Sequence, residues 1–214
     1  MKQLALILLL FISVGPKLFA QDIKEVFKTM PESITPLLSK NNKADFVDFM
    51  ESNMKAEVQN ELNGKSEMTA LDKDYISIQM TTESTWQMKL LPYKESYLIA
   101  IIETVKGPVV DSVLKFYTSE GVQLDEKPFF SIPSTEDFFK MERYRQDQSS
   151  ELDLKLKGVD MSLLQLGFSK DKLELSAKLT TLEYLNREDR SELDTLFKEE
   201  LIYQWEKGSF KLKS

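Results

Sequence analysis

Residues 74–105 read DYISIQMTTESTWQMKLLPYKESYLIAIIETV and carry the clearest strand pattern of the sequence. Apolar and polar residues alternate over 74–81 and again over 85–91, which is the two-residue period of a half-buried strand. Residues 97–105 are almost continuously apolar, as in a central strand. Short polar linkers separate the three segments, so the pattern predicts consecutive antiparallel strands.

The sequence before and after this stretch extends the pattern. Residues 111–118, DSVLKFYT, predict a fourth strand. Upstream, residues 22–30 carry one apolar stripe and predict a helix that ends at Pro31. A second helix is expected over 43–52, with Asn41 and Asn42 offering its cap.

Strand periodicity returns after a polar connector at residues 145–150. The expected strands are 152–156, 164–168, 173–179 and a terminal hairpin formed by 201–205 and 209–213 around Gly208. Two further helices are expected, one capped by Ser134 or Thr135 and running to Met141, the other from Arg187 to Lys198 after Asn186.

These elements predict an α+β fold with N-terminal helices followed by antiparallel β-meander sheets. We expect a signal peptide at 1–20, helices with a first meander at 21–145, and a second meander with a helix and C-terminal hairpin at 151–214. One continuous domain is the alternative to this division. A shift of 78 residues places Trp86 and Met88 on Leu164 and Leu166, which suggests two similar α+β units. Any two alternating meanders, however, overlay in this way.

The first twenty residues, MKQLALILLLFISVGPKLFA, have the layout of a secretory signal peptide. Lys2 precedes an apolar run over 4–14, and Ala20 supplies a small residue at the expected cleavage site. This run is shorter than the ~20 residues of a membrane span, which disfavours an uncleaved anchor. We therefore expect an exported protein, periplasmic or secreted, without a transmembrane anchor after cleavage. Lys17 and Leu18 fit the site poorly and leave the cleavage position open.

The composition indicates an ordinary globular chain. Hydrophobic residues make up 42% of the sequence and aromatic residues 10%, enough for a normal core. After removal of the leader, which contains two lysines and no acidic residue, 26 basic and 35 acidic side chains remain. Lys and Arg form no dominant basic stretch, which argues against nucleic acid as a partner.

Cysteine and histidine are both absent, and this excludes several chemistries. The sequence cannot form disulfides, thiol nucleophiles, catalytic triads containing His, or His-ligated zinc sites. We expect no cofactor and no metal. Asp72 and Asp74 resemble a fragment of a calcium loop, but the Gly and Glu that would continue it are missing. Glycine-rich nucleotide-binding motifs and a GxSxG motif are also missing.

Three acidic residues could contribute to catalysis by carboxylates. Asp45 and Asp48 are one helical turn apart, and Asp111 follows the turn at Gly107. For the first two we prefer the interpretation of a solvated helix face. For Asp111 we prefer a structural role, because an Asp after a turn commonly caps backbone groups.

Most aromatic residues fall within alternating strands and are expected in the core. The pairs Phe129–Phe130 and Phe138–Phe139 are exceptions, because adjacent rings cannot both point to one side of a strand. Phe129, Phe130, Phe138 and Phe139 therefore form a candidate interaction patch. The alternative is that they pack between two halves of the protein.

Three segments carry a resemblance to a known family. They are residues 22–81, beginning DIKEVFKTM, residues 103–121, ETVKGPVVDSVLKFYTSEG, and residues 203–210, YQWEKGSF. Together they resemble the secreted Bacteroidales proteins grouped as domain of unknown function 3256. The resemblance implies an exported protein and brings no activity, substrate or cofactor with it.

These observations favour a non-enzymatic binding or interaction module whose partner is a protein, a peptide or a glycan. The alternative is a carboxylate-based hydrolase that acts on an envelope or dietary polymer, which would require two close carboxylates in a pocket.

Overall fold

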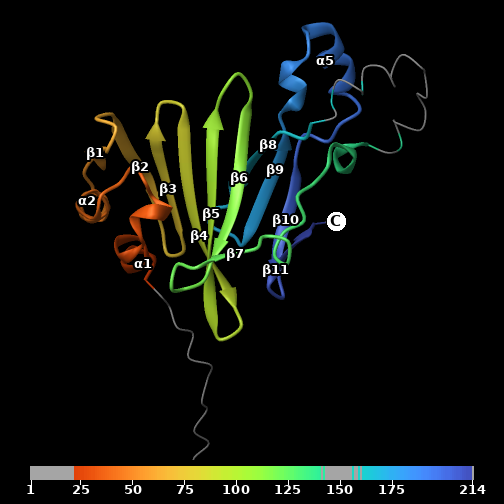
Figure 1. Ribbon diagram of the computed structural model, residues 1–214. Coiled ribbons are helices and arrows are strands. Elements are labelled where there is room, and N and C mark those ends of the chain that lie inside the picture. Colours follow the sequence, from red (N-terminus) through yellow and green to blue (C-terminus); the bar gives the residue numbers. More distant parts are fainter. Residues whose placement is uncertain (1–21, 141, 143–155, 157–158, 160, 214) are drawn as a thin grey trace, which may run out of the picture.

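The computed structural model describes residues 22–140, 142, 156, 159 and 161–213. These residues form two antiparallel sheets with helices at the N-terminal side, so the predicted α+β class is confirmed (Figure 1). The first sheet has seven strands in chain order: β1 (Glu57–Gln59), β2 (Lys65–Leu71), β3 (Tyr75–Thr81), β4 (Ser84–Tyr93), β5 (Ser96–Lys106), β6 (Val110–Tyr117) and β7 (Gln123–Leu124). The second has four: β8 (Leu164–Phe168), β9 (Glu174–Leu179), β10 (Leu201–Glu206) and β11 (Ser209–Leu212).

Helices occupy positions close to those that the periodicity predicts. The described α-helices are α1 (Ile23–Thr29), α2 (Lys40–Glu51) and α5 (Arg187–Leu193), and the 3-10 turns are η1 (Glu32–Ile34), η2 (Thr135–Phe138) and η4 (Thr181–Tyr184). The predicted cap of α2 is wrong, because the helix begins three residues earlier. The hydroxyl of Ser39 accepts the N–H of Asn42 at 3.2 Å, and the Asn42 side chain accepts the N–H of Ser39 at 3.1 Å.

Three other boundaries also differ from expectation. The helix predicted up to Met141 is only the turn η2, and α5 ends at Leu193, before a short bridge joins Phe139 to Phe197. The strand predicted at 152–156 falls mostly outside the described residues, and Leu156 has a helical conformation. The expected boundary between residues 145 and 151 also lies outside them.

One face of the seven-stranded sheet packs against α1 and α2. Phe27 and Phe46 of the helices are fully buried against Met88 and Ile101 of the sheet. Trp86 is 2% exposed, and its ring lies 5.9 Å from that of Phe27. Buried residues cover both faces of β5, which explains why this almost continuously apolar strand lies inside the sheet, between β4 and β6.

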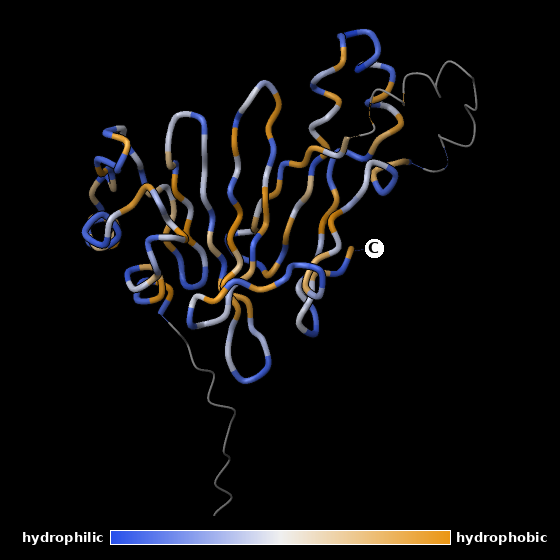
Figure 2. Tube along the Cα trace, viewed as in Figure 1, coloured by the Kyte–Doolittle hydropathy of each residue, from blue (hydrophilic) through white to orange (hydrophobic). Residues whose placement is uncertain are grey.

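The second sheet covers the opposite face at strands β4 to β6. Both sheets contribute to one hydrophobic cluster, which includes Leu91, Ile102 and Phe116 on one side and Leu166 and Leu175 on the other. Figure 2 shows hydrophobic residues in orange along the strands of both sheets, with hydrophilic residues concentrated at their turns. The two sheets are therefore held together by a shared core. The overlay of the two meanders stays a prediction. The residues that it matches can have different surroundings, because Trp86 packs against α1 whereas Leu164 packs in the core between the sheets.

The outer edge of β8 is bound by side chains of the first sheet rather than by the backbone of a neighbouring strand. The N–H groups of Leu164 and Leu166 donate to Asp111 Oδ1 at 3.2 Å and to Ser112 Oγ at 3.1 Å. The N–H of Phe168 donates to Gln87 Oε1 at 3.0 Å. We call this arrangement the capped edge. It satisfies backbone donors that an open edge strand would present to other chains.

A buried lysine fixes the same interface. Lys89 on β4 is 1% exposed, and its Nζ donates to Asp74 Oδ1 at 2.9 Å. It also donates to the carbonyl oxygens of Ser169 and Lys170 in the β8–β9 turn, each at 3.0 Å. All three ammonium hydrogens therefore have acceptors, which is how a protein tolerates a buried charge.

The C-terminal hairpin forms as predicted and turns at Gly208. This residue has a φ of 85°, and an added Cβ would lie 2.9 Å from the Tyr93 ring. Only glycine fits both the left-handed backbone and the close approach to Tyr93. The turn therefore places β10 and β11 against the first sheet, where Trp205 Nε1 donates to the carbonyl of Pro92 at 2.8 Å.

Candidate functional site

The three acidic residues considered for catalysis lie on two elements, Asp45 and Asp48 on α2 and Asp111 on β6. Asp45 and Asp48 are exposed on α2, which packs against the β1 and β2 side of the sheet. Asp111 is the second residue of β6 and accepts the N–H of Leu164, so it binds backbone as the preferred interpretation expected, although the backbone belongs to a strand distant in sequence. None of them lines the hollow beside α1 or the one beside α5, so the described residues give no support to a hydrolase that needs two close carboxylates in a pocket.

The suspected calcium fragment is occupied by lysines. Asp74 binds Lys89, and Asp72 lies 3.3 Å from the ammonium of Lys170. The two carboxylates therefore help to attach the β8–β9 turn to the first sheet. Within the residues that the structure describes, no group of acidic side chains is arranged to hold a metal ion.

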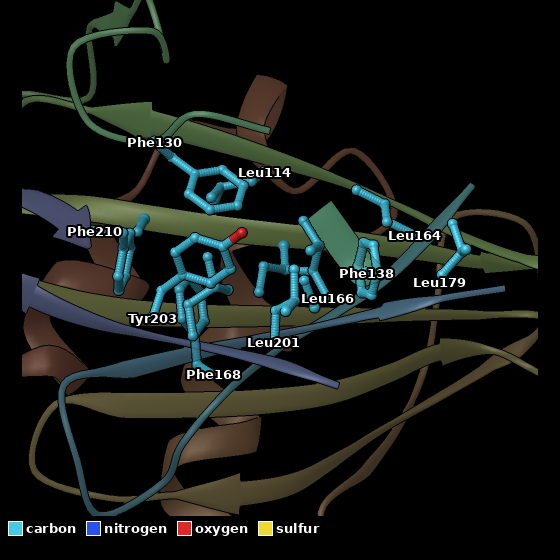
Figure 3. Packing of buried hydrophobic residues seen from close by; sticks show 14 of the residues in the cluster. Leu114, Phe130, Phe138, Leu164, Leu166, Phe168, Leu179, Leu201, Tyr203 and Phe210 are labelled. Carbon is cyan, nitrogen blue, oxygen red and sulfur yellow. The ribbon is translucent and has the colours of Figure 1, made fainter. Parts of the chain in front are cut away.

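The predicted interaction patch is wrong, because all four phenylalanine rings are buried. Phe129 and Phe139 are 8% and 9% exposed, while Phe130 and Phe138 are 2% and 0% exposed. Phe130 stands edge-on to Tyr203 at 5.1 Å and to Phe210 at 6.2 Å (Figure 3). The rings pack between the two sheets, which is the alternative that the sequence left open.

Burial at this interface also changes the titration of Tyr203. The apolar surroundings raise the pKa of the Tyr203 phenol from 10.0 to about 12, and the negative charge of Asp137 adds to the effect. Between pH 10 and 12 the folded state therefore keeps a proton that the unfolded state has lost.

We expect the stability of the protein to fall as the pH rises from 10 to 12. The contribution of Tyr203 is fully present below pH 10 and is lost as the pH passes the folded-state pKa, for a total of about 2–3 kcal/mol. Urea unfolding of the Tyr203→Phe variant at pH 9 and pH 11 should show a smaller loss than the wild type. An equal loss in both proteins would contradict the assignment, and Tyr184→Phe, which changes an exposed tyrosine, is the control.

A pocket of about 300 Å³ lies where α1 ends against the β6–β7 turn. Its apolar floor is formed by the buried residues Val26, Met30 and Ile99, and the exposed Pro31 and partly exposed Tyr97 also line it. Its rim is formed by Glu25, Thr29, Ser119, Glu120 and Gly121. We call it the α1–turn pocket. Polar and apolar residues contribute about equally to its lining, so it offers both kinds of contact to a ligand.

Local chemistry fixes the shape of the α1–turn pocket. Gly121 has a φ of 80°, and a Cβ there would lie 3.4 Å from Pro31, so the turn is held against the residue that ends α1. The Ser119 hydroxyl donates to Glu120 Oε1 at 2.7 Å and, with Thr118, holds the pKa of that carboxyl below its usual range. Burial raises the pKa of Tyr97, and the nearby charge of Glu120 raises it further.

Sequence reasoning missed the α1–turn pocket. Its residues come from α1, from β5 and from a turn about ninety positions after α1, so no local spacing joins them. The turn glycine, Gly121, was the only local signal available, and it marks a turn rather than a site.

A second hollow of about 330 Å³ lies beside α5. Its rim mixes Lys178 and Lys198 with Glu183 and Asp194. Lys198 Nζ donates to the carbonyl of Asp137 at 3.2 Å, and Arg190 lies 3.8 Å from Asp194. Because basic and acidic side chains both line this hollow, and some of them already bind one another or the backbone, the hollow favours neither an anionic nor a cationic ligand.

Comparisons with known proteins agree with this fold. A structure described as a domain of an uncharacterized protein from Porphyromonas gingivalis W83 superimposes with a TM-score of 0.78 and 27% sequence identity. The match covers 89% of this chain and 97% of that one. A search of the curated proteins gives no match. In the described part of the chain no helix is long and apolar enough to cross a membrane. The family described as "Protein of unknown function (DUF3256)" matches residues 16–210, so the chain belongs to the DUF3256 family.

Proposed function

We propose that the protein is an exported, non-enzymatic binding module, periplasmic or secreted, whose partner is a protein, a peptide or a glycan. The observation that carries the proposal is the α1–turn pocket, with its apolar floor and polar rim. The separation of Asp45 and Asp48 from Asp111 gives no support to the hydrolase alternative. Export is supported by the leader-like sequence at residues 1–20.

Titration of the purified protein with peptide and glycan libraries tests the binding function. We expect chemical shift changes at the amides of Ser119 and Gly121 when a ligand enters the pocket. The Thr29→Trp variant places an indole at the exposed end of α1 and should abolish these changes, because the ring fills the pocket. Asp45→Trp is the matched control on the exposed side of α2 and should leave binding intact.

Two results would overturn the proposal. One is the absence of any shift at the pocket with either library, and the other is hydrolysis of a polymer in the same samples. Mass analysis of the protein recovered from its native host tests export. Cleavage close to Ala20 in the periplasmic or external fraction is expected, whereas an intact chain in the cytoplasm would contradict it.

A further inference from the structure

The charged residues that line the α1–turn pocket are all acidic. Among the described residues that line it, the charged side chains are the two carboxylates Glu25 and Glu120. Lys28 binds Glu25 at 2.5 Å and does not belong to the lining. The carboxylate of Glu25 is therefore paired within α1, whereas Glu120 has no basic partner among the ion pairs of the described residues, so an anionic ligand would meet repulsion from Glu120.

We infer that the α1–turn pocket binds the side chain of a lysine or arginine on a peptide segment of a partner protein; this inference rests on the binding function proposed above. Both side chains combine an apolar stem with a terminal cation, which matches an apolar floor below an acidic rim. The pocket volume of about 300 Å³ is at the small end of ligand pockets, which suits one long side chain better than a larger molecule.

The methylene stem of this ligand would pack against the apolar floor. Met30 and Ile99 are 5% and 2% exposed, so they are held in the core and offer a fixed surface to a methylene chain. Tyr97 is partly exposed beside them and can cover the stem with its ring. A cation near such a ring gains further attraction from its electron density.

A carboxylate at the rim would bind the terminal cation of this ligand. Glu120 is fixed by the hydrogen bond from Ser119 and stays ionised at neutral pH, so it needs little rearrangement to accept a cationic donor. Glu25 lies on the exposed side of α1, where the Thr29 hydroxyl donates to its backbone carbonyl at 2.7 Å. Because Glu25 is paired with Lys28, Glu120 on the turn is the carboxylate that would accept the cation of the ligand.

The exposed surface beside the pocket suits a peptide backbone. Val122 is 61% exposed immediately after the turn, and it precedes β7, a two-residue strand at the end of the seven-stranded sheet. A partner segment that inserts its side chain into the pocket can lie across Val122. A neutral sugar would find only one aromatic ring, Tyr97, in the pocket lining.

Titration with blocked pentapeptides Ac-Gly-Gly-X-Gly-Gly-NH2 tests the inference, with X as lysine, arginine, norleucine or glutamate. We expect the lysine and arginine peptides to shift the amides of Ser119 and Gly121, and the other two to leave them unchanged. Glu120→Gln should weaken binding at least about tenfold, because the charge-assisted hydrogen bond is lost. Added salt should weaken binding to the wild type.

Glu83→Gln is the matched control, since it removes the same charge from an exposed residue of the β3–β4 turn. It should bind the lysine peptide as the wild type does. Equal binding of the norleucine and lysine peptides, or no binding of either cationic peptide, would overturn the inference. If a glycan or a non-cationic peptide shifts the same amides, only the choice of ligand fails. If no probe shifts them, the binding function fails as well.

Discussion

Replacing Lys89 with methionine should lower the free energy of unfolding by about 3 kcal/mol. The methionine keeps most of the apolar stem but removes the ammonium that serves Asp74 and the carbonyl oxygens of Ser169 and Lys170. Two backbone acceptors at the contact between the sheets then lose a donor that water cannot easily replace. Asp74 is about one-third exposed and can be solvated in part, so the cost lies at the lower end for a broken buried pair.

Guanidinium unfolding at neutral pH measures this effect. Lys73→Met is the matched control, because Lys73 is exposed and neighbours Asp74 in sequence, and it should change stability by less than about 0.5 kcal/mol. A double-mutant cycle with Asp74→Asn then separates the ion pair from the two carbonyl contacts. If Lys89→Met were as stable as Lys73→Met, the buried lysine would not hold the second sheet.

Replacing Phe130 with alanine should cost about 3–5 kcal/mol of stability. Its ring packs against Tyr203 of β10 and Phe210 of β11, so its removal leaves a cavity between the two sheets (Figure 3). This expectation follows from packing between the sheets. An exposed interaction patch would instead lose binding without losing stability.

Ile132→Ala is the control for Phe130→Ala. Ile132 lies two positions later in the same segment and is 59% exposed, so its truncation should change stability by less than about 0.5 kcal/mol. Thermal unfolding of both variants gives the comparison, and a shared core predicts that only Phe130→Ala lowers the melting temperature by several degrees. Equal melting temperatures would show that the ring is not part of the core.

The sequence predicted those strands in which apolar residues form a regular pattern because they are buried in a core. This was so for β3, β4, β6 and β8 to β11, whereas β5 was predicted from its almost continuous apolar run. β2 escaped prediction because a bulge between Met68 and Ala70 interrupts its alternation. β1 escaped it because three residues, Glu57–Gln59, are too short to show a period.

The fate of the paired phenylalanines could not be predicted from periodicity. Phe129 and Phe130 lie outside the strands, where a residue's direction has no two-residue rule. Their burial depends on β11, because the N–H of Phe210 donates to the carbonyl of Phe129 at 2.7 Å. The α1–turn pocket was beyond prediction for a similar reason, since tertiary packing alone brings its parts together.

The capped edge of β8 also sets an order of assembly. Its three acceptors on Asp111, Ser112 and Gln87 precede their donors by 53, 54 and 81 residues. The hairpins of the first sheet join neighbouring strands and can close quickly, whereas these contacts must wait for long loops to close. The ribosome synthesises the acceptor side chains on β4 and β6 before the N–H donors of β8. The large sheet can therefore form first and bind β8 after its synthesis. Among the described elements, we therefore expect the small sheet to fold last and to be lost first from a chain shortened at its C-terminus.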